Sequence, residues 1–450
     1  MKLKIRHVIL LLVALLELIV LLVFQIRQVN VQADLLSPAE GEETGIYGPL
    51  RLQFHQPMDQ ASVEAHFSLT PTAPGRFEWE EETLLFFPEI PLAPKQTYTL
   101  TLSAGAESEN GREVNDALSW TFTVRSPDIL YLSLAESGGD LWVWDTTEQA
   151  AHQLTETRGS VIDFDPSRTG EAVVYAALNS DGGSDLWTVD RNGEAKSMTL
   201  DCGPDYCTQP VWSPDDDWVA YTRETYDAAT GSHQGSRIWA LNMETGDSNP
   251  LYQSEDAAGH SPSFSPDGER LASFDLTQNG IRILDLATSQ ESIIPTSLQD
   301  LGDWSADGNR YLFTNLIPSV LESESTLYIA DLETQSIQEA LGGDVEGTTF
   351  SQPRWAPDGE WVAVALRPTN SAANRSLWVL RIDGSEAISV ENDGTADASS
   401  YRWGPWGKQL VYQTYRSGDP TSPSAIWLWD WNSRESILLT GGAARPIWLP

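Results

Sequence analysis

Residues 263–268 read Ser263-Phe264-Ser265-Pro266-Asp267-Gly268, and variants of this string recur over the last two-thirds of the chain. Proline fixes φ at the first corner of a tight turn, aspartate caps its own backbone, and glycine accepts the left-handed conformation. The string therefore predicts a hairpin connection that follows an aromatic residue. The other copies are Asp163-Phe164-Asp165-Pro166, Val211-Trp212-Ser213-Pro214-Asp215, Asp303-Trp304-Ser305-Ala306-Asp307-Gly308, Arg354-Trp355-Ala356-Pro357-Asp358-Gly359, Arg402-Trp403-Gly404-Pro405 and Ile447-Trp448-Leu449-Pro450.

The spacing of the copies identifies a repeat. Their aromatic residues are 48, 52, 40, 51, 48 and 45 residues apart, and a strand pattern follows each turn. The second half of each unit is another strand that mostly ends in aspartate, such as Leu186-Trp187-Thr188-Val189-Asp190. Four short strands at this period predict one blade of a β-propeller. Aromatic side chains between neighbouring blades would account for many of the 18 tryptophans.

The ends of the repeat predict the number of blades. Residues 129–155 supply three strands of a unit, six full units follow, and residues 445–450 supply one isolated first strand. Joining the one strand to the three would complete a seventh blade and remove exposed sheet edges. We therefore expect a seven-bladed propeller, with six blades as the alternative.

Residues 127–450 resemble the TolB-like, or WD40-like, propeller family in these repeated motifs. The resemblance implies that loops joining successive blades, and loops between the second and third strands, share one face. The sequence departs from the repeat at Asp216-Asp217, at Trp406 and at 167–170, where the Asp-Gly turn is altered.

A smaller β-domain is predicted before the propeller, over residues 34–125. Short alternating strands separated by turn residues predict an immunoglobulin-like β-sandwich. Residues 37–41, Leu52-Gln53-Phe54-His55-Gln56-Pro57-Met58-Asp59 and 87–98 resemble, in order, the bacterial SbsA-type Ig-like domain. The resemblance implies a surface spacer or adhesive module. The expected fold class is therefore all-β, apart from an N-terminal transmembrane helix.

The N-terminus predicts the location of the chain. Residues 1–33 contain three basic residues before an apolar run from Val8 to Phe24 that only Glu17 interrupts. The run is long enough for a single-pass signal anchor, and the charge bias places the remainder outside the cytoplasm. A cleaved signal peptide, cut after Ala33, is the alternative and would make the protein secreted.

The composition excludes one class of partner. The 450 residues include 65 acidic and 27 basic side chains, which gives a net charge of −38 and an isoelectric point near 4.3. A nucleic-acid binder must neutralise phosphates with lysine and arginine, so nucleic acid is not expected as a partner.

The two cysteines predict a local disulfide. Cys202 and Cys207 are separated by four residues that include Gly203 and Pro204, which can turn the chain, and export favours oxidation. A metal or redox pair is the alternative, but no histidine is close and the spacing is not Cys-x-x-Cys.

Catalytic motifs are missing from the sequence. It has no Gly-x-Ser-x-Gly, no His-Glu-x-x-His and no phosphate-binding glycine loop. Residues 215–217 could hold calcium with backbone carbonyls, although three successive aspartates more often form a solvated turn. We expect no metal site and no cofactor. A channel could still assemble distant catalytic residues, so an enzyme is the minority hypothesis.

Ligand-binding residues are expected on the longer loops of the propeller. Several arginines there could bind a carboxylate, although pairing of each arginine with a nearby acid is an equally good interpretation. The candidates are Arg223, Tyr226, His233, Arg237, Arg367, Arg375, Tyr415 and Arg416.

The combined hypothesis is a membrane-anchored, extracytoplasmic binding or scaffold protein whose propeller recognises a protein or cell-envelope polymer. The alternative is a surface glycan-active or peptide-active enzyme with its site in the propeller channel.

Overall fold

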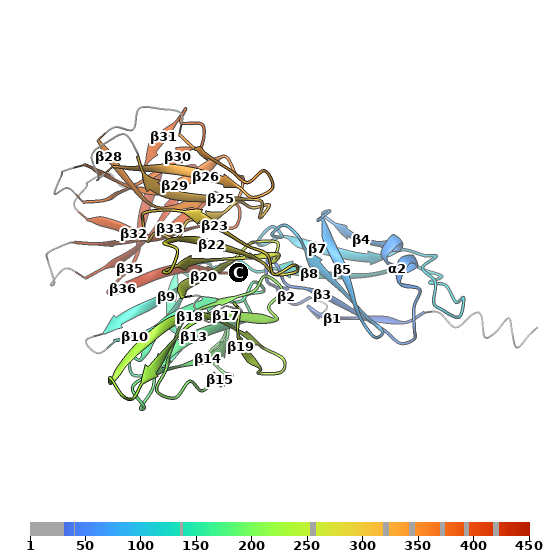
Figure 1. Ribbon diagram of the computed structural model, residues 1–450. Helices are drawn as coiled ribbons and strands as arrows, with labels where there is room; N and C mark the ends of the chain where they lie inside the picture. The colour runs from blue at the N-terminus through green and yellow to red at the C-terminus, as the bar shows by residue number, and fades with distance from the viewer. Residues whose placement is uncertain are drawn as a thin grey trace, which may run out of the picture. The chain divides into compact units, whose positions relative to one another are not determined.

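The computed structural model describes residues 31–39, 41–135, 138–252, 258–317, 324–341, 347–369, 374–390, 396–416 and 423–450. It divides into two compact units between Ser126 and Pro127 (Figure 1). Most of the predicted anchor, residues 1–30, lies outside the described residues. Within the described part of the chain, no helix has the length and apolar character needed to span a membrane.

The first unit consists of two four-stranded sheets that face each other. Phe67 of one sheet stacks on Phe86 of the other, with ring centroids 4.9 Å apart. A short helix follows Asp59, whose carboxylate accepts the Ser62 N–H as an N-cap. One sheet has the order β1(Ala33–Ser37), β3(Leu50–Phe54), β6(Thr83–Pro88), β5(Gly75–Glu80); the other has β2(Glu43–Thr44), β8(Leu118–Val124), β7(Thr97–Leu102), β4(Phe67–Thr70); the helix is α2(Gln60–His66).

The first unit begins earlier than the expected residue 34. Strand β1 starts at Ala33, Val31 is buried, and the Gln32 carbonyl accepts a hydrogen bond from the His55 N–H. Residues 31–33 are therefore part of the folded unit.

The second unit contains repeated groups of four antiparallel strands. The described strands form the groups β36(Ala443–Leu449), β9(Asp128–Ala135), β10(Gly138–Asp145), β11(Ala150–Gln153); β12(Val161–Pro166), β13(Ala172–Leu178), β14(Ser184–Asp190), β15(Lys196–Leu200); β16(Tyr206–Trp212), β17(Trp218–Asp227), β18(Ser232–Asn242), β19(Ser248–Pro250); β20(Gly259–Phe264), β21(Arg270–Asp275), β22(Gly280–Asp285), β23(Glu291–Pro295); β24(Asp303–Trp304), β25(Arg310–Leu316), β26(Ser325–Asp331), β27(Ser336–Glu339); β28(Thr348–Trp355), β29(Trp361–Pro368), β30(Ser376–Arg381), β31(Ala387–Ser389); and β32(Asp397–Trp403), β33(Gln409–Tyr415), β34(Ala425–Asp430), β35(Glu435–Gly441). Bridges between neighbouring strands join the first three groups into one larger sheet.

The hydrophobic core of this unit lies between the groups. Each described cluster contains side chains from two successive groups, as where Val174 and Leu186 of one group pack with Val219 and Tyr221 of the next. The last cluster brings Val411 of β33 together with Ile129 of β9. Sheet faces are thus buried pairwise around the whole unit.

The two ends of this unit meet in one group of strands. Strand β36 pairs with β9, so the last strand completes the group that the first three began (Figure 1). Arg191 connects the two ends, which we call the junction. Its guanidinium forms an ion pair with Asp128 and also donates a hydrogen bond to the Pro450 oxygen at 2.6 Å.

The altered repeat turns keep the hairpin. Asp216 takes the left-handed glycine position with φ of 62°. Its carboxylate accepts the N–H groups of Arg168 and Thr169 at 2.7 and 3.0 Å, which links it to the turn of the preceding group. At the Trp406 turn, Gly407 has φ of 65° and donates its N–H to the Gly404 carbonyl. The departures in sequence therefore do not remove the turns.

We expect Trp448→Ala to open the junction between the ends. Trp448 is 6% exposed, belongs to the cluster that joins β33 to β9, and donates its indole N–H to the Arg402 carbonyl at 3.2 Å. Its loss should lower the free energy of unfolding by about 3 to 5 kcal/mol, measured by denaturant unfolding. Trp218, which is 40% exposed, is the control. An equal effect of Trp218→Ala would contradict this account of the junction.

Candidate functional site

The inner strands of the second unit surround one cavity. Its volume is about 530 Å³, and residues from all seven groups line it. The polar and charged lining residues are Asp163, Asp165, Gln209, Ser261, Ser263, Ser265, Asp300, Asp303, Gln352, Arg354, Ser400, Tyr401, Arg402 and Arg445. We call this cavity the channel.

A bulge in the inner strands shapes the channel wall. Five lining residues adopt the left-handed conformation without being glycine, and the strand register shifts at each of them: Gln209, Ser261, Gln352, Ser400 and Arg445, with φ of 51°, 58°, 54°, 46° and 57°. A bulge redirects neighbouring side chains, and residues in this uncommon conformation concentrate at functional sites. The repetition of the bulge gives these five inner strands a common wall geometry.

The channel carboxylates connect neighbouring groups of strands by hydrogen bonds. Asp165 accepts the Trp212 N–H at 2.9 Å, and Asp303 accepts the Trp355 N–H at 2.8 Å. Each bond joins one inner strand to the next. Asp300 accepts the Gln352 N–H in the same manner, across to β28. The bond to Asp300 satisfies the Gln352 N–H, which the bulge removes from the strand ladder.

Burial changes the acidity of these carboxylates. It raises the pKa of Asp165 to about 7, against the lowering effects of the Trp212 N–H and the Arg402 guanidinium. Burial also raises the pKa of Asp303, which Arg354 and Arg402 partly offset. The channel therefore holds carboxylates whose charge is less complete near neutral pH than that of a surface aspartate.

Three arginines share the channel with these carboxylates. Arg445 forms an ion pair with Asp163. Arg354 and Arg402 lie at equivalent positions of β28 and β32, each immediately before the aromatic residue of the repeat. Repulsion from the Arg354 guanidinium, followed by burial, lowers the pKa of Arg402 to about 9.

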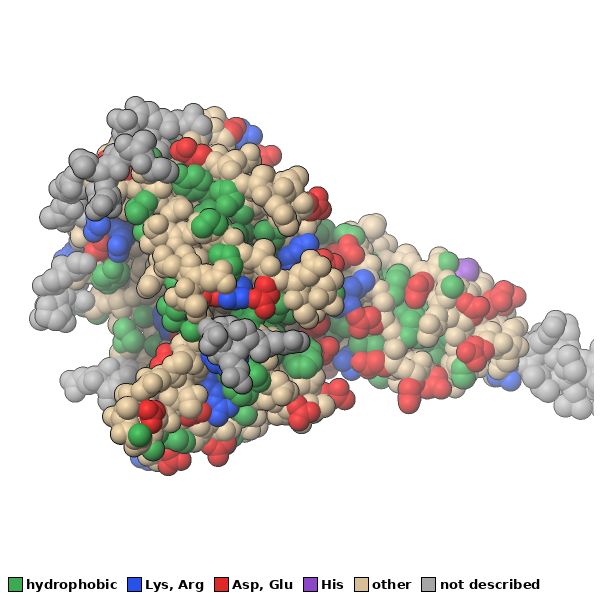
Figure 2. All heavy atoms as spheres, viewed as in Figure 1, with side chains coloured by type: hydrophobic (Ala, Val, Ile, Leu, Met, Phe, Trp, Pro, Cys, Tyr) green, Lys and Arg blue, Asp and Glu red, His purple; other side chains and the backbone are tan. Residues whose placement is uncertain are grey.

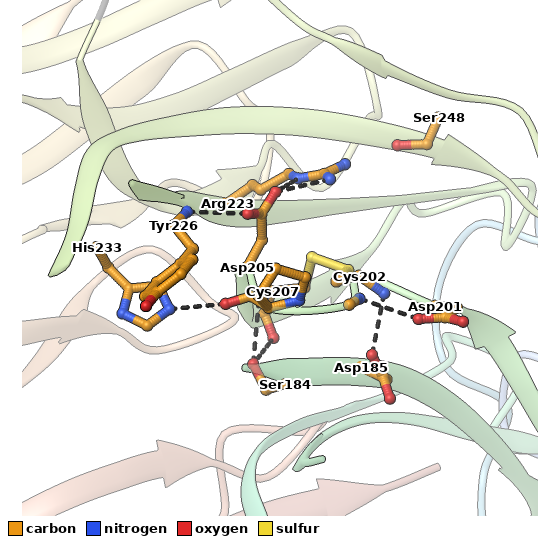
Figure 3. Close-up of polar contacts among 12 residues, drawn as sticks. Ser184, Asp185, Asp201, Cys202, Asp205, Cys207, Arg223, Tyr226, His233 and Ser248 are labelled. Carbon is orange, nitrogen blue, oxygen red and sulfur yellow. Dashed lines mark hydrogen bonds and ion pairs between the residues drawn. A yellow bond between two sulfur atoms is a disulfide. The ribbon is translucent and has the colours of Figure 1, made fainter. Parts of the chain in front are cut away.

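A second cluster surrounds the disulfide loop, and we call it the rim cluster (Figure 3). Cys202 and Cys207 are bonded to each other, and the enclosed Asp205 pairs with Arg223 at 2.7 Å and accepts the Tyr226 N–H at 2.9 Å. This loop leads into β16, which lines the channel at Gln209.

An aromatic surface completes the rim cluster. The His233 ring lies 3.9 Å from the Tyr206 ring and 5.4 Å from the Tyr226 ring, measured between centroids. His233 Nε2 donates to the Pro204 carbonyl at 2.8 Å. Tyr226 is 38% exposed and is available to a ligand.

The structure thus brings together only part of the predicted binding set. Arg223, Tyr226 and His233 lie in the rim cluster, and Arg223 has the acidic partner that the alternative interpretation predicts. Arg237, in the same group of strands, donates to the Tyr252 carbonyl at 3.3 Å. Arg367, Arg375, Tyr415 and Arg416 belong to or border the last two groups, where the Arg375 N–H donates to Asp397.

The sequence interpretation missed the arginines and aspartates of the channel. The pattern that marks several of them is the residue before each repeat aromatic, which is Asp163, Asp303, Arg354 or Arg402 in four copies. In the sequence these four residues belong to the turn motif, and in the structure all four line the cavity.

The three successive aspartates of the altered turn serve the turn. Asp215 accepts the hydroxyl of Ser213 and the N–H of Asp217, while Asp216 bonds the preceding group. In the described part of the chain, no group of three or more His, Cys, Asp or Glu side chains is arranged to hold a metal ion.

Comparison with known proteins supports the two-unit architecture. The family model of the bacterial Ig-like domain matches residues 29–124. A comparison with curated proteins finds no match. The chain therefore contains a bacterial Ig-like domain, as predicted.

Several solved structures are similar to the chain. One is described as the β-propeller domain of the Trilobed protease from Pyrococcus furiosus; it is 12% identical, with 77% of this chain and 93% of that chain covered, at a TM-score of 0.48. TolB from Acinetobacter baumannii is 18% identical, with 72% of this chain and 82% of that chain covered, at a TM-score of 0.44. A prolyl endopeptidase structure is 14% identical, with 71% of this chain and 50% of that chain covered, at a TM-score of 0.53. A puromycin-hydrolysing peptidase from Mycobacterium tuberculosis is 15% identical, with 72% of this chain and 54% of that chain covered, at a TM-score of 0.50. At such identities the likeness shows the fold alone, and the support for the fold comes from the two peptidase structures, whose TM-scores are 0.50 or more.

The raised pKa of Asp165 predicts an unusual dependence of stability on pH. The folded state keeps a proton on Asp165 up to about pH 7, whereas the unfolded chain loses it near pH 4. The protonated Asp165 carboxyl therefore makes its full contribution to the free energy of unfolding below about pH 4, and this contribution is lost as the pH rises to about 7. Asp165→Asn should remove on the order of 1 kcal/mol or more of the stability difference between pH 5 and pH 8, measured by denaturant unfolding.

Asp331→Asn is the matched control. Hydrogen bonds from Thr334 lower the pKa of Asp331, so its titration lies below this pH range. If Asp165→Asn and Asp331→Asn leave the same pH dependence as the wild type, the Asp165 carboxylate is not held in its protonated form.

Proposed function

We propose that residues 127–450 form a seven-bladed β-propeller whose channel binds a segment of a protein or cell-envelope polymer. The seven groups of described strands, the cores between successive groups and the pairing of β36 with β9 support this blade count. A propeller presents its inner strands to a common axis, where a ligand can contact several blades at once.

The observation that carries the proposal is the polar channel of about 530 Å³. This volume falls in the range of cavities that hold small ligands or a few residues of a polymer. Its wall combines amide, hydroxyl and guanidinium groups on a scaffold fixed by bonds between blades. Rigid placement of such groups reduces the entropy lost on binding.

The rim cluster is a second contact region in this proposal. Its disulfide and the bonds of Asp205 fix the positions of Arg223 and Tyr226. Because the loop continues into β16, a segment bound at Gln209 can extend to the Tyr226 side chain.

Hydrolysis of a glycan or peptide is the second candidate function, and one observation favours it. Asp165 lines the channel with a pKa of about 7, which suits a general acid or base at neutral pH. Turnover of a glycan or peptide by the wild type that Asp165→Asn abolishes would support the enzyme over the binding protein.

The N-terminal run of residues 8–24 is proposed as an uncleaved membrane anchor that keeps both domains outside the cytoplasm. Burial of Val31 and the bond between Gln32 and His55 support this choice, because cleavage after Ala33 would remove three residues of the folded Ig-like unit, 31–33. The disulfide agrees with an oxidising compartment.

The anchor predicts retention in the membrane. After alkaline carbonate extraction of membranes, the full chain should remain in the pellet, and mass spectrometry of its N-terminus should find residues before Val31. A soluble product beginning at Asp34 would contradict the anchor and favour the cleaved signal peptide.

Site-specific photo-crosslinking tests binding in the channel. A photoreactive residue at Gln352, which is exposed in the channel, should form a discrete adduct with an envelope protein or polymer in intact cells. The same residue at Gln338, exposed on the outer strand β27, is the control. Equal adducts at both positions, or none at Gln352, would overturn the channel as the binding site.

The rim cluster is tested in the same experiment. Tyr226→Ala and His233→Ala remove its aromatic surface without touching the channel wall. If the rim contributes, each should reduce the adduct at position 352 by about half or more. An unchanged adduct would restrict the site to the channel.

A further inference from the structure

In the described part of the chain, two channel arginines form no ion pair with a carboxylate. Arg354 donates to the carbonyls of Gly302 and Pro353 at 2.7 and 3.3 Å, and Arg402 donates to the carbonyl of Tyr401 at 2.9 Å. Among the described residues, neither guanidinium forms an ion pair within 4 Å. A guanidinium carries five N–H donors, so these bonds leave donors of both residues for another acceptor.

The nearby carboxylates are already engaged. Asp165 and Asp303 attract the guanidinium of Arg402, but each directs an oxygen to a backbone N–H of the next blade. Burial also raises the pKa of both carboxyls, so they neutralise the arginines incompletely. The adjacent guanidinium groups repel each other as a result.

The third channel arginine provides the contrast. The Arg445 guanidinium pairs with Asp163 and donates to the Ile162 carbonyl. Among the described residues, Arg445 is thus the channel arginine that forms an ion pair, whereas Arg354 and Arg402 form none.

We propose that Arg354 and Arg402 together bind one carboxylate group of a peptide segment that enters the channel, an inference that rests on the proposed binding function. Two neighbouring guanidinium groups offer paired N–H donors that match the oxygens of a carboxylate, and binding relieves their mutual repulsion. Their equivalent positions on adjacent inner strands direct both toward the same part of the channel.

The charge of the chain favours a peptide over a polyanionic glycan. The net charge is −38, and Figure 2 shows acidic side chains spread over the visible surface of the described residues. Such a surface repels a polymer that carries a carboxylate on every sugar. A peptide with a single carboxylate meets far less repulsion, and the channel volume accommodates a few residues.

Small peptides that differ only in their carboxylate test the inference. The full chain, purified in detergent, is titrated with N-acetyl-Ala-Ala-Ala, with its C-terminal amide and with N-acetyl-Ala-Glu-Ala-amide, and binding is followed by saturation-transfer NMR. One or both carboxylate peptides should bind, and the uncharged amide should bind at least fivefold more weakly. Binding of only the first identifies a chain terminus as the source of the carboxylate, and binding of only the third identifies an acidic side chain.

Substitutions locate the site. Arg402→Gln and Arg354→Gln should each weaken binding of the carboxylate peptide at least fivefold, while Arg445→Gln should change it less than twofold. Melting temperatures check folding, because Arg402→Gln also removes the attraction to Asp165 and Asp303. Arg402→Gln is the decisive variant because, among the described residues, the Arg402 side chain donates a hydrogen bond only to the adjacent Tyr401 carbonyl. Binding unchanged by Arg402→Gln would overturn the site.

The remaining outcomes also decide. Equal binding of the uncharged amide, or no binding of any of the three peptides, overturns the inference. Binding of trigalacturonate in place of the peptides overturns the choice of a peptide. If the crosslink at position 352 still forms after both arginine substitutions, the binding function stands but the carboxylate site is wrong. If no crosslink forms at position 352 when both arginines are intact, the binding function is wrong.

Discussion

The packing of each sheet against the next is the constraint on which the propeller depends. Among the described residues, no group of four strands buries its faces alone, because each hydrophobic cluster of the second unit takes side chains from two successive groups. The first and last groups would therefore expose an apolar face unless they met, and β36 brings them together through its pairing with β9. The same cluster that joins Val411 to Ile129 completes this arrangement.

The channel is a consequence of that closure. Once the inner strands face one axis, the bulges at positions such as Gln352 and Ser400 turn polar residues into the space between them. The aspartates there bond backbone N–H groups of the next blade and contribute to the assembly of the wall. Arg354 and Arg402 form no ion pair with a described carboxylate, which is why we propose a binding role for them.

The sequence was sufficient for the architecture and insufficient for the channel. Alternation, turn residues and a repeat of about 50 residues are local properties, so the strands, the Ig-like domain and the propeller followed from them. The position of Cys202 and Cys207 on one short loop likewise made their pairing predictable. The channel depends instead on non-local closure and on bulges whose direction the alternating pattern does not reveal. Loop length predicted ligand-binding residues in the rim cluster instead, where Arg223 forms an ion pair with Asp205.

An experimental structure of the full chain with para-bromobenzoate would test the central claim most directly. This compound carries one carboxylate and one bromine atom, which anomalous scattering locates. We expect a single strong bromine peak in the channel, with the carboxylate oxygens within hydrogen-bond distance of the Arg354 and Arg402 guanidinium groups. A peak at the rim cluster, or on the outer strands with the channel empty, would contradict it.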